Sequence, residues 1–105
     1  MPRDVVTDET IETPVHQVRT LFENLIGALV DEPDEVNIRV VQGVQAVIYE
    51  VEVHPDDVRR IIGRKGRTAD ACRELLTNLG SKAGLRFLLE IVEPQERSSR
   101  PSRHL

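Results

Sequence analysis

Apolar residues between positions 13 and 31 recur at spacings of three and four, which is the period of an amphipathic helix. They are Val15, Val18, Phe22, Leu25 and Leu29. Thr13 and Pro14 stand before them as a capping residue and a proline suited to the first helical position. The pattern predicts a helix that begins at Thr13 and ends near Asp31, before Pro33.

Three later segments alternate apolar and polar residues, as half-buried strands do. They cover residues 36–40, 47–53 and 87–91. Gln42 and Gly43 supply a turn between the first two segments, so these two are predicted to pair as a hairpin.

Two further helices are predicted between the second and third strands. Asp56 and Asp57 open a short helix that runs to Ile62, with acidic residues at the end that the helix dipole makes positive. A longer helix begins near Arg67 and turns one apolar stripe toward the core: Ala69, Cys72, Leu76 and Leu79. The element order is α-β-β-α-α-β, an α+β fold in which helices cover one face of a three-stranded sheet.

The chain of 105 residues has room for one domain, which we place at residues 13–93. Residues 1–12 are polar and show no periodicity, so we predict that they form a flexible N-terminal arm. Residues 94–105 are rich in Ser, Arg and Pro, so we predict that they form a disordered tail. No segment reaches the roughly 18 apolar residues of a membrane span, and the acidic N-terminus lacks a signal-peptide pattern. We therefore expect a cytoplasmic protein with no membrane partner.

Charge is distributed unevenly along the chain, whose net charge is −4. Residues 1–57 hold 13 acidic and 3 basic residues, whereas residues 58–105 hold 5 acidic and 11 basic residues. Six of these bases lie between positions 59 and 73: Arg59, Arg60, Arg64, Lys65, Arg67 and Arg73. A local basic patch can bind phosphates on an acidic protein, although such a run can equally be the solvated face of a helix.

The four-residue loop from Gly63 to Gly66 joins the short helix to the long one. Its two glycines permit sharp backbone turns and leave no Cβ to obstruct a sugar-phosphate chain. Arg64 and Lys65 add positive charge, and the following helix presents unpaired N–H groups at the positive end of its dipole. Glycines at this spacing also occur in helix-turn-helix pairs that merely turn, so the loop alone is weak evidence.

The wider string is more specific, because Ile61-Ile62-Gly63-Arg64-Lys65-Gly66-Arg67 is followed by a helix with periodic apolar residues. It resembles the KH signature, in which such a loop clamps about four nucleotides of backbone. A helix and two strands before the helix pair and one strand after it resemble the type II KH arrangement. The resemblance implies single-stranded RNA as the ligand. The implied contacts are Ile61, Ile62, Gly63, Arg64, Lys65, Gly66, Arg67, Thr68 and Ala69.

Within KH proteins, the chain resembles the small bacterial KhpA family over roughly residues 14–93. The resemblance rests on the segment 31–36, of sequence Asp-Glu-Pro-Asp-Glu-Val, and on the loop string 62–67. Cys72 departs slightly from the branched aliphatic residue common there. Membership implies an RNA chaperone that regulates RNA after transcription with a KhpB-like partner carrying KH and R3H domains. It also implies links to cell-wall homeostasis and cell shape.

No residue set predicts an enzyme, a metal site or a cofactor. The acidic residues at positions 31, 32, 34 and 35 match no calcium-loop spacing and are interrupted by Pro33. Cys72 lies in phase with the core stripe, which favours packing over a nucleophile paired with His54. The three aromatic residues, Phe22, Tyr49 and Phe87, also lie in phase with core positions. A base-stacking platform of aromatic residues is therefore not expected.

An alternative role is that of a protein-interaction subunit whose KH fold mainly docks a partner. Ile48, Leu88 and Val92 fall on the sheet face opposite Tyr49 and Phe87. A sheet face open to water is normally more polar, so these three are a candidate interface. A homodimer is one solution, and the N-terminal arm or a helix of the same chain covering these residues is another.

Overall fold

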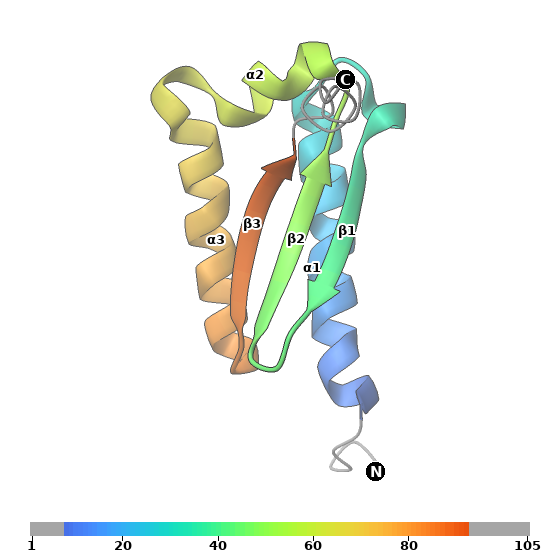
Figure 1. Ribbon diagram of the computed structural model, residues 1–105, viewed down its shortest axis with the longest axis vertical. Helices are drawn as coiled ribbons and strands as arrows, with labels where there is room; N and C mark the ends of the chain where they lie inside the picture. The colour runs from blue at the N-terminus through green and yellow to red at the C-terminus, as the bar shows by residue number, and fades with distance from the viewer. Residues whose placement is uncertain (1–7, 93–105) are drawn as a thin grey trace, which may run out of the picture.

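The computed structural model describes residues 8–92 and has the predicted element order (Figure 1). Three helices and three strands follow one another along the chain: α1 (Asp8–Leu29), β1 (Asn37–Gln42), β2 (Ala46–Glu52), α2 (Val58–Ile62), α3 (Arg67–Ala83) and β3 (Arg86–Val92). Short 3-10 turns precede β1, α2 and α3. The α+β fold class predicted from the sequence is confirmed.

The sheet is mixed, with the strand order β1-β2-β3. β1 and β2 form the predicted antiparallel hairpin, in which Val40 is opposite Tyr49. β3 is parallel to β2, with Leu89 opposite the same tyrosine. A parallel neighbour requires a crossover, and α2 and α3 provide it. The crossover places the loop between these helices beyond one end of the sheet (Figure 1).

Helix α1 begins at Asp8, five residues before the predicted start at Thr13, and ends at Leu29. The predicted arm of residues 1–12 therefore overlaps the helix, while residues 1–7 and the predicted tail lie outside the described residues. Pro14 lies inside the helix, where it removes one backbone hydrogen bond without ending the element.

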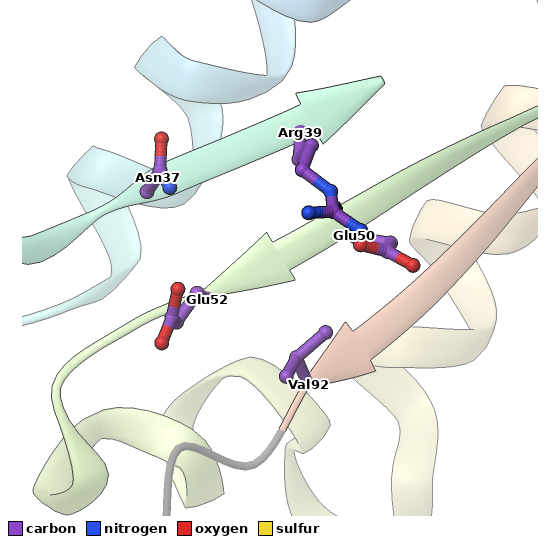
Figure 2. Close-up of a pocket in the computed structure, with 5 residues that line it drawn as sticks. All are labelled: Asn37, Arg39, Glu50, Glu52 and Val92. Carbon is purple, nitrogen blue, oxygen red and sulfur yellow. Dashed lines mark ion pairs between the residues drawn. The ribbon is translucent and has the colours of Figure 1, made fainter. Parts of the chain in front are cut away.

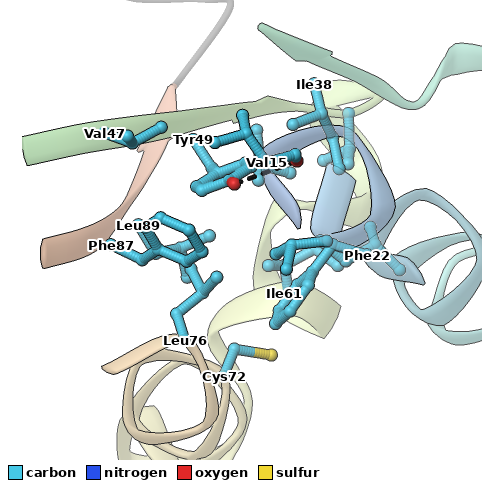
Figure 3. Packing of buried hydrophobic residues seen from close by; sticks show 14 of the residues in the cluster. Val15, Phe22, Ile38, Val47, Tyr49, Ile61, Cys72, Leu76, Phe87 and Leu89 are labelled. Carbon is cyan, nitrogen blue, oxygen red and sulfur yellow. Dashed lines mark hydrogen bonds between the residues drawn. The ribbon is translucent and has the colours of Figure 1, made fainter. Parts of the chain in front are cut away.

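The core lies between the sheet and the helices, on the face of β2 that presents Val47, Tyr49 and Val51 (Figure 3). Tyr49 is fully buried, and its hydroxyl donates a hydrogen bond of 3.0 Å to the carbonyl oxygen of Val15 on α1. Its ring meets that of Phe87 edge to face, with centroids 5.3 Å apart. Burial raises the pKa of Tyr49 to about 12, so the hydroxyl keeps its proton and remains a donor.

Gly80 lets α3 pack directly on the chain that enters β3. A Cβ at this position would lie 2.6 Å from the carbonyl oxygen of Leu85 and 2.9 Å from the backbone nitrogen of Phe87. Backbone atoms cannot move aside as a flexible side chain can. Gly80 therefore sets the distance between α3 and β3, and the end of the helix is marked instead by Gly84, at φ 75°.

Replacing Gly80 with Ala should destabilise the fold. Overpacking against backbone costs roughly 1–3 kcal/mol, and the better helix propensity of Ala returns up to about 1 kcal/mol. Urea unfolding should show a lower midpoint with an unchanged slope. Ser81→Ala, an exposed change one residue away in the same helix, is the control and should stay within about 0.5 kcal/mol of wild type. Equal stability of Gly80→Ala and Ser81→Ala would contradict the close approach.

Candidate nucleic-acid interface

The short helix α2 is held in place by a buried carboxylate at its start. Asp57 is 1% exposed, and its two oxygens accept hydrogen bonds from the backbone N–H groups of Asp31, at 3.1 Å, and Glu32, at 3.0 Å. Arg60 adds an ion pair to Asp57 at 3.2 Å and another to Asp31 at 2.6 Å. These contacts tie α2 to the turn between α1 and β1, about 26 residues earlier in the chain.

Three of the four residues in the loop after α2 have positive φ. Gly63, Lys65 and Gly66 have φ values of 81°, 58° and 75°. The N–H of Gly63 donates to the carbonyl of Arg59 at 2.8 Å, and the N–H of Gly66 donates to the carbonyl of Gly63 at 3.1 Å. Lys65 is the only residue other than glycine with positive φ in the described part of the chain. Such strain at a loop marks a position where function is expected.

Gly63 is required for two independent reasons. Its combination of φ 81° and ψ 171° belongs to a region that only glycine adopts readily. A Cβ at this position would also lie 2.3 Å from Oγ1 and 2.8 Å from the backbone nitrogen of Thr68. Gly66 has a left-handed conformation, but no atom lies within 4 Å of the position of its Cβ. The loop therefore packs against the first turn of α3 at Gly63 and is open at Gly66.

The start of α3 faces the loop with its backbone donors. The N-cap residue of α3 is Gly66, which has no side chain that could cap the helix. No other side chain forms a capping hydrogen bond at this end either. α3 is 17 residues long, so its dipole places partial positive charge there. The end of α3 beside the loop is therefore suited to receive an anionic group.

The ion pairs divide the six predicted bases into two groups. Arg60 is paired with Asp31 and Asp57, and Arg73 lies 3.5 Å from Asp70. The other four are exposed and have no carboxylate partner among the described residues: Arg59, Arg64, Lys65 and Arg67. We call these four residues the loop cations. Their charge is not neutralised locally, so it is available to an anionic ligand.

The uncharged residues on the two sides of the loop, which were predicted to contact RNA, differ in how deeply they are buried. Ile61 is fully buried and Ala69 is 3% exposed, so both pack in the core rather than on the surface. Ile62 and Thr68 are half-buried on either side of the loop. The structure thus brings the loop residues 62–68 together at the surface, with Ile61 and Ala69 behind them as support. Sequence periodicity predicted the burial of Ala69 on α3, but it did not distinguish Ile61 from Ile62, because α2 has only five residues.

The chain matches the family model described as "KhpA/KhpB, KH domain" over residues 19–91, which contain β1, β2, α2, the loop, α3 and all of β3 except Val92. The chain belongs to this family. The KH fold and the KhpA resemblance identified from the sequence are confirmed. The match includes the C-terminal half of α1, whereas the residues before 19 fall outside it.

Curated relatives carry the name RNA-binding protein KhpA. The protein of Chlamydia pneumoniae is 46% identical over 69 residues, which cover 66% of this chain and 88% of that one. The protein of Borreliella burgdorferi is 42% identical over 73 residues, or 70% and 89% of the two chains. The protein of Aquifex aeolicus is 42% identical over 76 residues, or 72% and 96%. No solved structure matches this chain.

Cys72 and His54, which were considered from the sequence as a nucleophile and a base, both have structural roles in this KH domain. Cys72 is 5% exposed within the core, and burial raises the pKa of its thiol, which disfavours a reactive thiolate. His54 Nδ1 accepts a hydrogen bond of 3.0 Å from the N–H of Asp56, which caps the turn before α2. Within residues 8–92, no cluster of side chains is suited to hold a metal ion, and no helix is long and apolar enough to cross a membrane.

The candidate interface residues lie on the open face of the sheet, but not all together. Ile48 on β2 is directly opposite Leu88 on β3, whereas Val92 is opposite Glu52, four residues further along β3. Val92 lines a shallow hollow with charged residues at that end (Figure 2). Val41, which sequence reasoning missed, is opposite Ile48 on its other side. Only the strand register reveals this third member.

Alanine at the two loop glycines should have unequal effects in this KH domain. Gly63→Ala meets both the forbidden backbone region and the contact with Thr68, so we expect a loss of about 3 kcal/mol or more. Gly66→Ala, the matched control, meets only the left-handed penalty of about 1–2 kcal/mol. Chemical denaturation followed by circular dichroism measures both. Equal losses would show that the contact between Gly63 and Thr68 is not a close one.

Proposed function

We propose that this chain binds single-stranded RNA through the loop at residues 63–66. The observation that carries the proposal is the group of four loop cations without local carboxylate partners, arranged around a strained turn at the start of α3. The names of the KhpA relatives support the ligand class. We also propose that the domain as a whole acts by binding RNA and not by catalysing a reaction.

The RNA backbone would pass over the loop, where glycines at both ends allow close approach. Arg64 and Lys65 would neutralise phosphates, and the uncapped N-terminus of α3 would add N–H donors. Two to three phosphates fit a loop of this size, which agrees with a clamp of about four nucleotides in KH domains. The same contact surface is too short to follow a long duplex.

Bases would be recognised without aromatic stacking. Phe22, Tyr49 and Phe87 are all buried in the core, which leaves no phenylalanine or tyrosine ring on the described surface. The half-buried Ile62 and Thr68 flank the loop and offer apolar contact and a hydroxyl group to unstacked bases.

The resemblance to KhpA proteins supports a finer proposal. We propose that the chain acts in the cytoplasm as an RNA chaperone and post-transcriptional regulator together with a KhpB-like partner carrying KH and R3H domains. Roles in cell-wall homeostasis and cell shape follow from the same resemblance. A domain with a single small clamp binds weakly on its own, so a second RNA-binding protein would raise affinity through avidity.

The second candidate function is that of a protein-interaction subunit. The specific observation in its favour is the row of aliphatic residues across the open sheet face, formed by Val41, Ile48 and Leu88. This role is compatible with RNA binding, because the loop and the open sheet face are separate surfaces.

Reversing the charge of the loop should abolish RNA binding without unfolding the protein. Arg64→Asp with Lys65→Asp removes two charge-assisted contacts, worth about 1.5–3 kcal/mol each, so affinity should fall by about 100-fold or more. Fluorescence anisotropy with a labelled single-stranded RNA measures this change. The melting temperature should be kept, because both side chains are exposed.

The matched control is Arg19→Asp with Lys82→Asp. It makes the same change in net charge at one residue on α1 and one near the end of α3, both away from the loop. This control should bind RNA within about threefold of wild type, apart from a weak general electrostatic effect. If both double variants lose affinity equally, net charge rather than the loop determines binding.

A further inference from the structure

Strand β1 forms a free edge of the sheet, because its only strand neighbour among the described residues is β2 (Figure 1). The N–H of Gly43 donates to the carbonyl oxygen of Ala46 at 2.7 Å, so these two residues form a hydrogen-bonded pair of the hairpin. Hydrogen-bonded and non-hydrogen-bonded pairs alternate along an antiparallel ladder. The backbone groups of Ile38, Val40 and Gln42 therefore point away from β2, toward the free edge.

The free edge of β1 has little of the protection that sheet edges usually carry. Its register with β2 runs from Asn37 to Gln42 without a bulge, and the strand contains no proline. Arg39 is its one charged residue, whereas β3 at the other edge of the sheet carries both Arg86 and Glu90. An extended segment of another molecule can therefore add to β1 as a fourth strand.

An open hollow lined by α1 and β1 lies along this edge. Helix α1 contributes His16 and Arg19, and β1 contributes residues 37–40 and 42. None of these lining residues is acidic, whereas two of them, Arg19 and Arg39, are positively charged. A strand added to this edge would lie beside both arginines, so negative charge on that strand would favour its binding.

The basic lining of this hollow contrasts with the acidic half of the chain from which it is built. Residues 1–57 hold 13 acidic and 3 basic residues, and the basic ones are Arg3, Arg19 and Arg39. Arg3 lies outside the described residues, so both described arginines of this half line the same hollow. The fold thus concentrates at the β1 edge the positive charge that this half of the chain possesses.

The ion pairs that the two arginines form within the chain are of a kind that a ligand can replace. Arg19 pairs with Glu23 at 3.2 Å, one helical turn later on α1, and Arg39 pairs with Glu50 at 3.1 Å across the open sheet face. The side chain of Arg39 remains 70% exposed. Exposed pairs contribute little to stability, so both arginines are available to carboxylates of a ligand.

We propose that the free edge of β1 binds an extended acidic segment of a partner protein, which adds to the sheet as a fourth strand. The backbone of the segment forms hydrogen bonds with the outward groups of Ile38, Val40 and Gln42, and these bonds supply affinity. Adjacent carboxylates of the segment project to opposite faces of the sheet, where one meets Arg39 and the next meets Arg19. These contacts supply selectivity for an acidic sequence.

Charge and backbone chemistry favour this ligand over two others. Residues 94–105 of the same chain hold three arginines and one glutamate, so like charge opposes their binding to the basic lining. A nucleic acid would satisfy the charge, but its sugar-phosphate backbone has no alternating N–H and C=O groups to continue the ladder of a sheet. The inference does not rest on the proposed RNA function, because residues 63–66 are not part of this edge.

An NMR titration of the full chain with the capped peptide Thr-Thr-Glu-Glu-Thr-Thr, which matches β1 in length, tests the proposal. We expect saturable binding with a Kd of about 0.1–1 mM, as for a small transient interface. The largest amide shifts should occur at Ile38, Val40 and Gln42, whose N–H groups gain acceptors. A peptide with Lys in place of Glu should bind about tenfold more weakly. The acidic peptide with methylated central backbone nitrogens keeps its charge but loses donors, and it should also bind about tenfold more weakly.

Matched variants separate the backbone contacts from the charges. Gln42→Pro removes one outward N–H and leaves the bonds between β1 and β2 intact, so it should weaken peptide binding by about tenfold. Gln42→Ala keeps the N–H and should bind within about twofold of wild type. Arg19→Gln with Arg39→Gln should weaken binding by about five- to tenfold. Its control, Lys82→Gln with Arg86→Gln, removes two charges outside the hollow and should have little effect.

The proposal is wrong if the acidic peptide does not bind saturably at several millimolar, or if the lysine or methylated peptide binds equally well. It is also wrong if the largest shifts lie outside the β1 edge. Melting temperatures confirm that each variant is folded, and the methylated peptide tests the backbone contacts on the unaltered protein. A single-stranded RNA tetramer should leave the amides of Ile38, Val40 and Gln42 unshifted. If RNA shifts them and the acidic peptide does not, the hollow binds nucleic acid instead, whereas failure of RNA to shift the loop concerns only the proposed function.

Discussion

The absence of a side chain at Gly63 is the constraint on which the candidate site depends. The backbone there occupies a region closed to other residues, and the first turn of α3 lies where a Cβ would be. This close approach turns the chain from α2 into α3 within four residues. It thereby places Arg64 and Lys65 at the surface beside the uncapped end of α3. A wider loop would separate the cations from the helix donors.

The surroundings of the loop hold it rigidly from both sides. Asp57 fixes the start of α2 through two backbone N–H groups of a distant turn, and Ile61 anchors the same helix in the core. On the other side, Gly80 allows α3 to lie against β3. Arg60 lies close to these anchors, and its charge is neutralised by ion pairs with Asp31 and Asp57. The loop cations have no such carboxylate partner among the described residues. The charges that stabilise the fold and the charges proposed to bind RNA are thus separated within a few residues.

Local patterns were sufficient to predict most of the fold. Strict alternation identified all three strands, and Gly63 and Gly66 marked the loop, because period and turn chemistry are properties of short segments. The start of α1 was missed, since the signal at Thr13 and Pro14 was stronger than that of the acidic residues at its true start. The burial of Ala69 was predicted from the apolar stripe of α3, whereas the burial of Ile61 was not separated from the half-exposed position of Ile62, because α2 has only five residues.

Long-range features were beyond reach of the sequence for a different reason. The hydrogen bonds of Asp57 join positions 25 and 26 residues apart, and no local pattern reports such a contact. The aliphatic row likewise depends on strand register. The sequence grouped Val92 with Ile48 and Leu88, whereas the register shows that Val41 is the neighbour of Ile48 in this row. Alternation determines which face a residue occupies, but only pairing determines which residues are neighbours on it.

An NMR titration of the full chain with a single-stranded RNA tetramer of mixed sequence tests the central claim most directly. Backbone amide shifts report contacts at every described residue except proline, without any substitution. The account predicts that the largest changes occur at residues 62–68, and that the amides of Val41, Ile48 and Leu88 on the open face change little. Saturable binding with its largest shifts on the open sheet face, and none in the loop, would contradict it.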